Sequence, residues 1–223
     1  MKNKTLWKQV GAAAIAAAMV MSTVPATPVQ AAGGKTLAVS SQKQLNQALK
    51  TVKGKNAVIT VKAGKNVKIT IPKGTYKVTI RVVGKKAAVV NNGTVKEIVV
   101  NSKGTVAIKN NGTIKKVTVQ NAKSVSFSGN HKKAVPVVVN AEDVSMILAA
   151  PAKITAKKDV NIVLKKGAEK SSITCTKNVQ AQVDNQTKKA ISVKIADGTT
   201  LKVESGESCT ITPKGKKEDT SGE

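Results

Sequence analysis

Three consecutive segments of this chain share one pattern: AAVVNNGTVKEIVV at 87–100, TVAIKNNGTIKKVTV at 105–119 and SVSFSGNHKKAVPVVV at 124–139. The tetrad NNGT begins at Asn91 and again at Asn110, a spacing of 19 residues. Apolar residues keep this spacing in two rows, Val106, Val125 and Val144 in one and Ile108, Phe127 and Met146 in the other. A repeat of this length holds two short strands and cannot bury its apolar face alone, so consecutive repeats must stack into a solenoid.

Strand-like alternation of apolar and polar residues extends from the repeats toward both ends of the chain. Before the clear repeats, strands are expected near 57–61, 67–71 and 78–83. In the coils that follow, the first strands are expected near 87–90, 106–108, 125–127, 144–148, 160–164, 179–183 and 201–203. The second strands are expected near 98–100, 117–119, 135–139, 154–156, 173–175, 191–195 and 209–211. Gly, Asn, Lys and Pro fill the turns between them. The sequence therefore predicts an all-β, single-stranded parallel β-helix of about 19 residues per coil, with equivalent strands ~4.8 Å apart.

One helix is expected ahead of the coils. Ser41 and Gln44 fit a capping box, and apolar residues follow at the spacing of one helical face, at Leu45, Ala48, Leu49 and Val52. An open solenoid end exposes apolar side chains and unpaired strand edges, which a helix laid across it would cover. We interpret the helix near 41–53 as an N-terminal cap; an ordinary surface helix is the alternative.

Both ends of the chain differ from the repeats. Residues 1–32 combine three early lysines, the apolar run Val10–Val20 and the small-residue site Val29–Ala31, a pattern typical of a secretory signal peptide. This pattern predicts export without membrane insertion after cleavage. The β-helix domain is expected over 33–212, and the polar segment 213–223, PKGKKEDTSGE, is expected to be disordered.

The chain is rich in lysine. It has 38 Lys and Arg against 12 Asp and Glu, a formal charge of +26, and Arg81 is its only arginine. Removing the signal peptide takes away three lysines and no acid, which leaves +23. A lysine surface attracts polyanions by charge, whereas arginine supports geometric recognition. Aromatic residues make up 1% of the chain, so stacking on sugar rings or bases is not expected.

A lysine precedes the second strand in successive coils, which predicts a column of ammonium groups along one edge of the solenoid. Its members are Lys77, Lys96, Lys115, Lys133, Lys153, Lys170 and Lys189. A column of like charges repels itself, but it would release counterions cooperatively on an anionic polymer. The alternative is a solvated face that deters edge pairing and aggregation.

No catalytic, metal or cofactor site is predicted. His131, the single histidine, has no partner that the sequence places beside it, and the adjacent acids Glu142 and Asp143 fit a solvated turn. Cys175 and Cys209 are assigned to inward positions two coils apart, ~10 Å by the strand spacing, so we predict buried thiols and no disulfide. Four turn asparagines are expected to form amide ladders between coils and to tolerate a left-handed backbone: Asn91, Asn92, Asn110 and Asn111.

The leader, the segment SSQKQLNQAL at 40–49 and the NNGTV and NNGTI coils together resemble secreted right-handed parallel β-helix proteins of Gram-positive bacteria, the pectate-lyase-like superfold, over roughly 38–212. The resemblance implies a right-handed β-helix and is compatible with several functions. The preferred hypothesis is a secreted, non-catalytic surface protein that binds anionic cell-envelope polymers or acidic glycans. A polysaccharide lyase or hydrolase and a purely structural or adhesive module are the alternatives, and nucleic acid is not an expected native partner.

Overall fold

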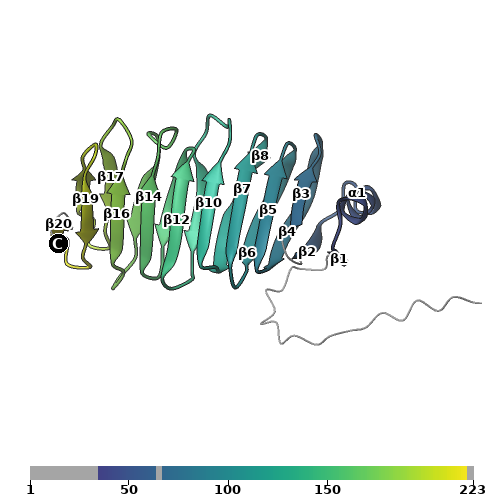
Figure 1. Cartoon of the computed structure of the whole chain (residues 1–223), viewed down its shortest axis with the longest axis horizontal. Coiled ribbons are helices and arrows are strands. Elements are labelled where there is room, and N and C mark those ends of the chain that lie inside the picture. The colour runs from purple at the N-terminus through teal and green to yellow at the C-terminus, as the bar shows by residue number, and fades with distance from the viewer. Residues whose placement is uncertain (1–34, 64–66, 220–223) are drawn as a thin grey trace, which may run out of the picture. The chain divides into compact units, whose positions relative to one another are not determined.

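The computed structural model of the chain describes residues 35–63 and 67–219, so the predicted signal peptide at 1–32 lies outside the described residues. Within them, about eight coils of roughly 19 residues stack along one axis, and the chain passes alternately through two sheets (Figure 1). The predicted all-β parallel solenoid is confirmed.

The eleven-stranded sheet consists of β1 (Lys35–Val39), β2 (Ala57–Ala63), β4 (Thr75–Gly84), β6 (Thr94–Asn101), β9 (Val117–Asn121), β11 (Val135–Val139), β13 (Ala152–Ala156), β15 (Ser172–Cys175), β17 (Ile191–Lys194) and β18 (Thr200–Val203), in that order, with β8 (Thr113–Ile114) paired to β6. The nine-stranded sheet consists of β3 (Val67–Ile71), β5 (Lys86–Asn91), β7 (Thr105–Asn110), β10 (Ser124–Ser128), β12 (Val144–Ala149), β14 (Val160–Leu164), β16 (Ala181–Asn185), β19 (Ser208–Ile211) and β20 (Lys217–Asp219).

The core lies between the two sheets and is made of aliphatic rows. In β7, for example, Val106 and Ile108 are 1% exposed, whereas the intervening residues face solvent. Val106 pairs with Val125 of the next coil and Ile108 with Phe127, so like side chains lie over one another. Burying such rows is the main favourable contribution that each coil receives from its neighbours.

One predicted register is wrong. Val125 pairs with Met146 rather than with Val144, so the step from β10 to β12 is 21 residues instead of 19. The two connections of this coil, from β10 to β11 and from β11 to β12, are each one residue longer than their counterparts in the coil before. Asp143, in the second of them, adopts a left-handed backbone with φ 52°. A shift of two residues keeps the same side chains inward, because strand side chains alternate with a period of two.

Helix α1 (Gln42–Thr51) contacts β1, β2 and β3 at the N-terminal end of the coils, as the predicted cap requires (Figure 1). Ser41 is the N-cap, its hydroxyl accepts a hydrogen bond from the Gln44 backbone N–H, and the predicted apolar face is buried. The Gln42 side chain accepts from the Thr70 N–H at 2.6 Å and donates to the Thr70 carbonyl at 2.8 Å. The helix thus satisfies backbone groups of β3, which is an edge strand. With 10 residues α1 is short, and no described helix has the length and apolar character of a membrane span.

The C-terminal end departs from the predicted coil pattern. Both β18 and β19, expected as further parallel rungs, pair antiparallel with the preceding strands β17 and β16, and each lies in the sheet opposite to the one predicted. Residues 217–219, expected to be disordered, form β20 and pair antiparallel with β19. Antiparallel strands need only short connections, so the chain can fold back on its last coil and cover its edge.

The predicted asparagine ladders are present. Asn91 Nδ2 donates to Asn110 Oδ1 at 2.8 Å inside the core, and Asn111 Nδ2 donates to Asn92 Oδ1 at 3.0 Å on the surface. None of the four asparagines makes use of its tolerance for a left-handed backbone, because Asp143 and Asn178 are the only described non-glycine residues with positive φ.

The glycine of each NNGT tetrad allows coils to approach closely. A Cβ atom at Gly112 would lie 2.1 Å from the carbonyl oxygen of Gly93, one coil earlier. Such a distance is far below a van der Waals contact with backbone that cannot easily move. The recurring glycine therefore marks coil-to-coil contact rather than a special turn geometry.

The two cysteines are buried thiols, as predicted. The predicted arrangement two coils apart in one sheet is wrong, since Cys175 belongs to β15 and Cys209 to β19, in opposite sheets. Burial and, to a smaller extent, the nearby Asp159 carboxylate raise the pKa of the Cys175 thiol from 9.0 to about 11.

We expect Asn91→Ala to lower the free energy of unfolding by about 2–3 kcal/mol, because it leaves buried polar groups unpaired. Asn92→Ala, which removes the half-buried member of the neighbouring surface ladder, should lower it by less than about 0.5 kcal/mol. Urea unfolding followed by circular dichroism measures both. Equal losses for the two variants would show that the buried ladder adds nothing.

The pKa of the Cys175 thiol predicts a loss of stability in alkali. A thiol with a raised pKa in the folded state contributes stability below the unfolded pKa, near 9.0, which is lost as the pH rises toward 11. Between those values we expect the parent chain to lose about 2 kcal/mol more than Cys175→Ala. Because both proteins carry the same lysines, lysine titration cancels in this comparison, and parallel pH profiles would contradict the prediction.

Candidate polyanion-binding surface

Positive charge is almost uncompensated in the part of the chain before Glu142, because the cations are spread evenly along the chain and the acids are not. Of the 38 Lys and Arg residues, 24 precede Glu142, together with only one of the 12 acids, Glu97. That one acid is held locally: the Thr118 hydroxyl donates to Glu97 Oε1 at 2.6 Å, and Lys116 Nζ lies 3.6 Å from the same atom. The coils from β2 to β11 therefore present cations with almost no compensating negative charge.

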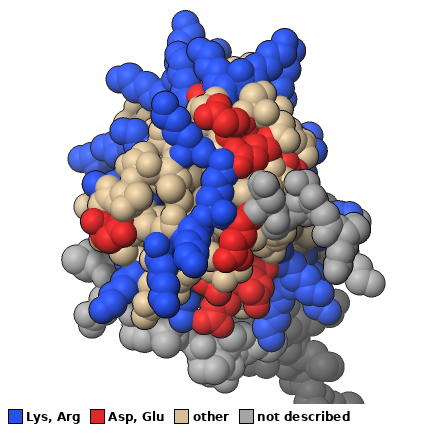
Figure 2. Space-filling model, turned by 90° about the vertical axis from the view of Figure 1, so that its left-hand side faces the viewer, with Lys and Arg blue, Asp and Glu red and all other residues tan. Residues whose placement is uncertain are grey.

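Negative charge gathers at the opposite end. Figure 2 looks onto the C-terminal end and shows acidic side chains in a band across it, with lysines around them. Acids of the last strands and turns supply this charge: Asp184, Asp197, Glu204, Glu207 and Glu218. A hydrogen bond from Lys217 lowers the pKa of the Glu207 carboxyl, which keeps it ionised. The solenoid is thus electrically asymmetric along its axis.

The predicted lysine column begins as a continuous row. Val95 of β6 pairs with Ile114 of β8, so the residues that follow them, Lys96 and Lys115, occupy equivalent positions in adjacent coils. Lys77 lies in an irregularity of β4 between Tyr76 and Thr79, opposite Lys96. All three lysine side chains are exposed.

Beyond the third coil the lysines leave this register. Lys133 lies in the turn before β11, and Lys153 sits on the outer face of β13, where it pairs with Pro136 and Ser172. Lys170 and Lys189 lie close together, because both line a surface pocket of about 540 Å³ with Lys132 and Lys188. The structure therefore brings together two groups of the predicted lysines on one edge instead of a single straight column.

The pocket with Lys170 and Lys189 also contains an acid. The carboxylate of Glu169 accepts the backbone N–H of Gly167 at 2.9 and 3.1 Å. This hydrogen bond lowers the pKa of the Glu169 carboxyl, and the nearby ammonium groups of Lys166 and Lys189 lower it further. An anion approaching this pocket meets a charged acid as well as four lysines.

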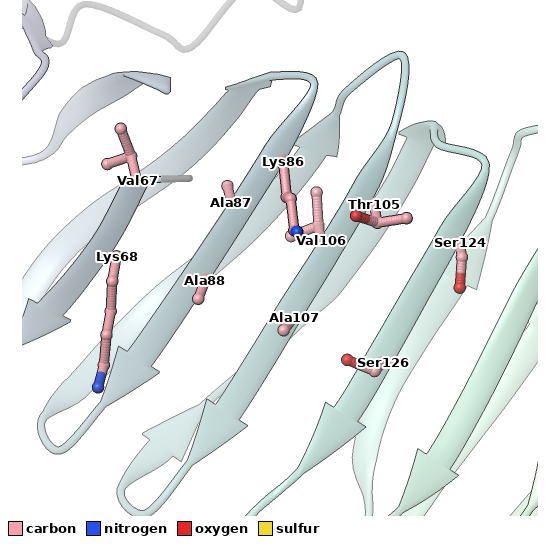
Figure 3. Close-up of a pocket in the computed structure, with 10 residues that line it drawn as sticks. All are labelled: Val67, Lys68, Lys86, Ala87, Ala88, Thr105, Val106, Ala107, Ser124 and Ser126. Carbon is pink, nitrogen blue, oxygen red and sulfur yellow. The ribbon is translucent and has the colours of Figure 1, made fainter. Parts of the chain in front are cut away.

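A second feature, not expected from the sequence, is a shallow trough on the outer face of the nine-stranded sheet. Outward positions of β5, β7 and β10 carry Ala88, Ala107 and Ser126, which pair across the strands and continue the line of Lys68 on β3 (Figure 3). Because these side chains are small, a depression of about 290 Å³ forms over them. The signal was present in the sequence as a small residue at one outward position of each of these strands, but only the register aligns them.

Polar groups line one side of this trough. Lys86, Thr105 and Ser124 form the adjacent row across the same strands (Figure 3). Two ammonium groups and several hydroxyls therefore lie around a floor of small side chains, and no acid is among the described residues that line it. Such a surface offers donors to a hydroxylated, acidic ligand lying flat on the sheet.

The residues considered for catalysis have local structural partners. His131 Nδ1 lies 3.2 Å from the Asn110 carbonyl and Nε2 3.0 Å from the Pro151 carbonyl, and its ring packs edge-on against Phe127. The Glu142 carboxylate accepts from Lys158 Nζ at 2.7 Å on the surface. Within residues 35–63 and 67–219, no three His, Cys, Asp or Glu side chains gather as a metal ion would require.

Comparison with protein-family models, curated proteins and solved structures finds no match to this chain.

The row of like charges predicts that removing one lysine stabilises the fold. At low salt, Lys96→Gln should raise the free energy of unfolding by roughly 0.5 kcal/mol, because it relieves repulsion from the lysines on either side. In 0.5 M NaCl the gain should vanish through screening. Lys116→Gln is the matched control: Lys116 faces Glu97, so its loss should not stabilise the protein. Equal effects of both variants would argue against a repulsive row.

Proposed function

We propose that this chain is a non-catalytic extracellular β-solenoid that associates electrostatically with anionic cell-envelope polymers or acidic glycans. The observation that carries the proposal is the nearly uncompensated positive charge of the coils before Glu142. A fold built only for stability gains nothing from such repulsion, whereas a linear polyanion bound along it would release its counterions.

The type of cation supports attraction by charge. Lysine presents a compact, strongly hydrated charge on a flexible stem, and only Arg81 could form a planar bidentate contact. Aromatic residues that would stack on sugar rings make up 1% of the chain. Binding would therefore depend on salt concentration and on the charge density of the polymer more than on the identity of its sugars.

The trough gives the proposal a place where a polymer could lie. Lys68 and Lys86 flank a flat, uncharged floor, on which hydroxyl groups of Thr105, Ser124 and Ser126 are within reach of a sugar chain. Acidic polysaccharides carry both carboxylates and hydroxyls, which are the groups these side chains would bind. The secretory pattern of residues 1–32 is consistent with partners outside the cell.

We expect the chain to be retained on immobilised polygalacturonate or teichoic acid and to elute as NaCl rises. A variant with Lys68, Lys86, Lys96 and Lys115 changed to Gln should elute at clearly lower salt, with the slope of log affinity against log salt reduced by roughly three. The matched control changes four lysines of the second half to Gln, at Lys177, Lys194, Lys202 and Lys214. Because the part of the chain from Glu142 on carries 11 of the 12 acids, the elution of this control should shift less.

Retention that ignores salt, or equal shifts for the two quadruple variants, would contradict the electrostatic proposal. Release of unsaturated products from polygalacturonate, followed by ultraviolet absorbance, would contradict the non-catalytic assignment and favour a lyase. Surface association that persists in the first variant would favour an adhesive module in which the lysines serve only solubility.

A further inference from the structure

The turn before β11 interrupts the stack of coils. Strand β8 pairs with β6 on one side, and no described strand pairs with it on the other. In the next coil the segment 129–134, GNHKKA, replaces a matching strand. A pocket of about 310 Å³ lies between them, lined by Gly112, Thr113 and Ile114 on one side and by residues 131–135 on the other.

Asn110 lines this pocket and has an unsatisfied donor. Its Oδ1 accepts from Asn91 Nδ2 at 2.8 Å and from the Gly112 N–H at 3.3 Å. Its Nδ2 is the one buried side-chain nitrogen or oxygen without a hydrogen-bond partner in the described part of the chain, although Asn110 is 0% exposed. An unpaired buried donor is costly, by about 1–3 kcal/mol, so such a group calls for an acceptor.

Two other buried asparagines that end a strand of the nine-stranded sheet, Asn91 of β5 and Asn185 of β16, show what is missing. Asn91 Nδ2 donates to three acceptors, the Gly93 carbonyl, Asn110 Oδ1 and the Thr113 carbonyl of the next coil. Asn185 Nδ2 donates to three carbonyls, those of Lys189, Val203 and Glu204. In both cases the neighbouring coil supplies an acceptor. At Asn110 the next coil supplies Gly129, which has no side chain, followed by a turn that stays apart from β8.

The charge around the pocket indicates what the acceptor would be. Lys132 and Lys133 line it and are exposed, His131 lines it as well, and no acid is among its described lining residues. The nearest carboxylate in the adjoining pocket, that of Glu169, is already bound to the Gly167 N–H. An uncharged acceptor would satisfy Asn110 but would leave the two ammonium groups unused.

We propose that this pocket is an oxyanion site, in which a carboxylate or phosphate oxygen accepts from Asn110 Nδ2 while Lys132 and Lys133 neutralise its charge. The inference deepens the proposed function, because it names one point where an acidic group of a bound polymer would be held. The inference can also be tested separately from the proposed function, since a small anion could occupy the pocket without any polymer. The charge-assisted hydrogen bond and the partial enclosure distinguish this point from the exposed lysines elsewhere.

The test is a titration of the ¹⁵N-labelled chain, beginning at residue 33, with sodium acetate and, separately, inorganic phosphate at constant ionic strength. The side-chain amide of Asn110 should shift downfield and saturate. The side-chain amide of Asn111, which donates to Asn92 on the surface, is the internal control and should move little. Saturation with acetate alone would identify a carboxylate site, and saturation with phosphate alone would identify a phosphate site.

Variants separate the pocket from general charge. Lys132→Gln with Lys133→Gln should weaken the anion roughly tenfold, by the loss of two nearby charges. Lys165→Gln with Lys166→Gln removes the same charge from another turn and should leave the titration within about twofold. These exposed substitutions leave the Asn110 ladder intact, so both proteins should fold.

An Asn110 amide that does not respond to either anion, or that moves only in parallel with Asn111, would overturn the proposal and indicate a buried water as the acceptor. Equal weakening by the two double variants would overturn it as well. The polymer experiment is independent of this outcome: salt-dependent retention without an Asn110 response would leave the proposed function standing and remove only the site. An Asn110 response without polymer retention would support the anion site and contradict the proposed function.

Discussion

Every feature of this protein depends on parallel pairing between equivalent strands of successive coils. A single coil of about 19 residues buries almost nothing by itself, and its backbone groups are satisfied only when another coil lies on each side. Stacking also places buried polar groups beside their counterparts, as Asn91 and Asn110 show. Stability and surface pattern consequently arise from the same repetition, since a residue type that recurs at one position of the coil becomes a row on the molecule.

A stack of this kind must be closed at both ends, and the chain closes its two ends differently. At the first coils, α1 covers apolar side chains, and Gln42 takes both backbone groups of Thr70. At the last coils, β18, β19 and β20 turn back antiparallel, so the terminal edge belongs to a hairpin instead of a rung. The antiparallel strands at this end also carry acids, and Figure 2 shows acidic side chains in a band across it.

The candidate binding features of this protein lie where the repeat is interrupted or irregular. Where Gly129 follows Asn110 in the stack, the ladder ends, the next turn forms no strand beside β8 and a buried donor has no acceptor. Where small residues line up across β5, β7 and β10, the outer face of the sheet becomes a trough between lysines. A regular solenoid offers only flat faces and turns, so binding would be expected at such departures from regularity.

The amino-acid sequence was sufficient for the fold class, the cap helix, the aliphatic core and the asparagine ladders, because each of these depends on a local period or on a spacing of 19 residues. It did not determine the register beyond Phe127, the antiparallel ending or the sheet of Cys209, since turn lengths are free to vary by two residues without turning a single side chain outward. For the same reason the lysine row was foreseen at Lys96 and Lys115 but not its break at Lys133. The register between coils, which only the tertiary structure shows, decides which lysines lie side by side. It also decides which buried donor has no partner.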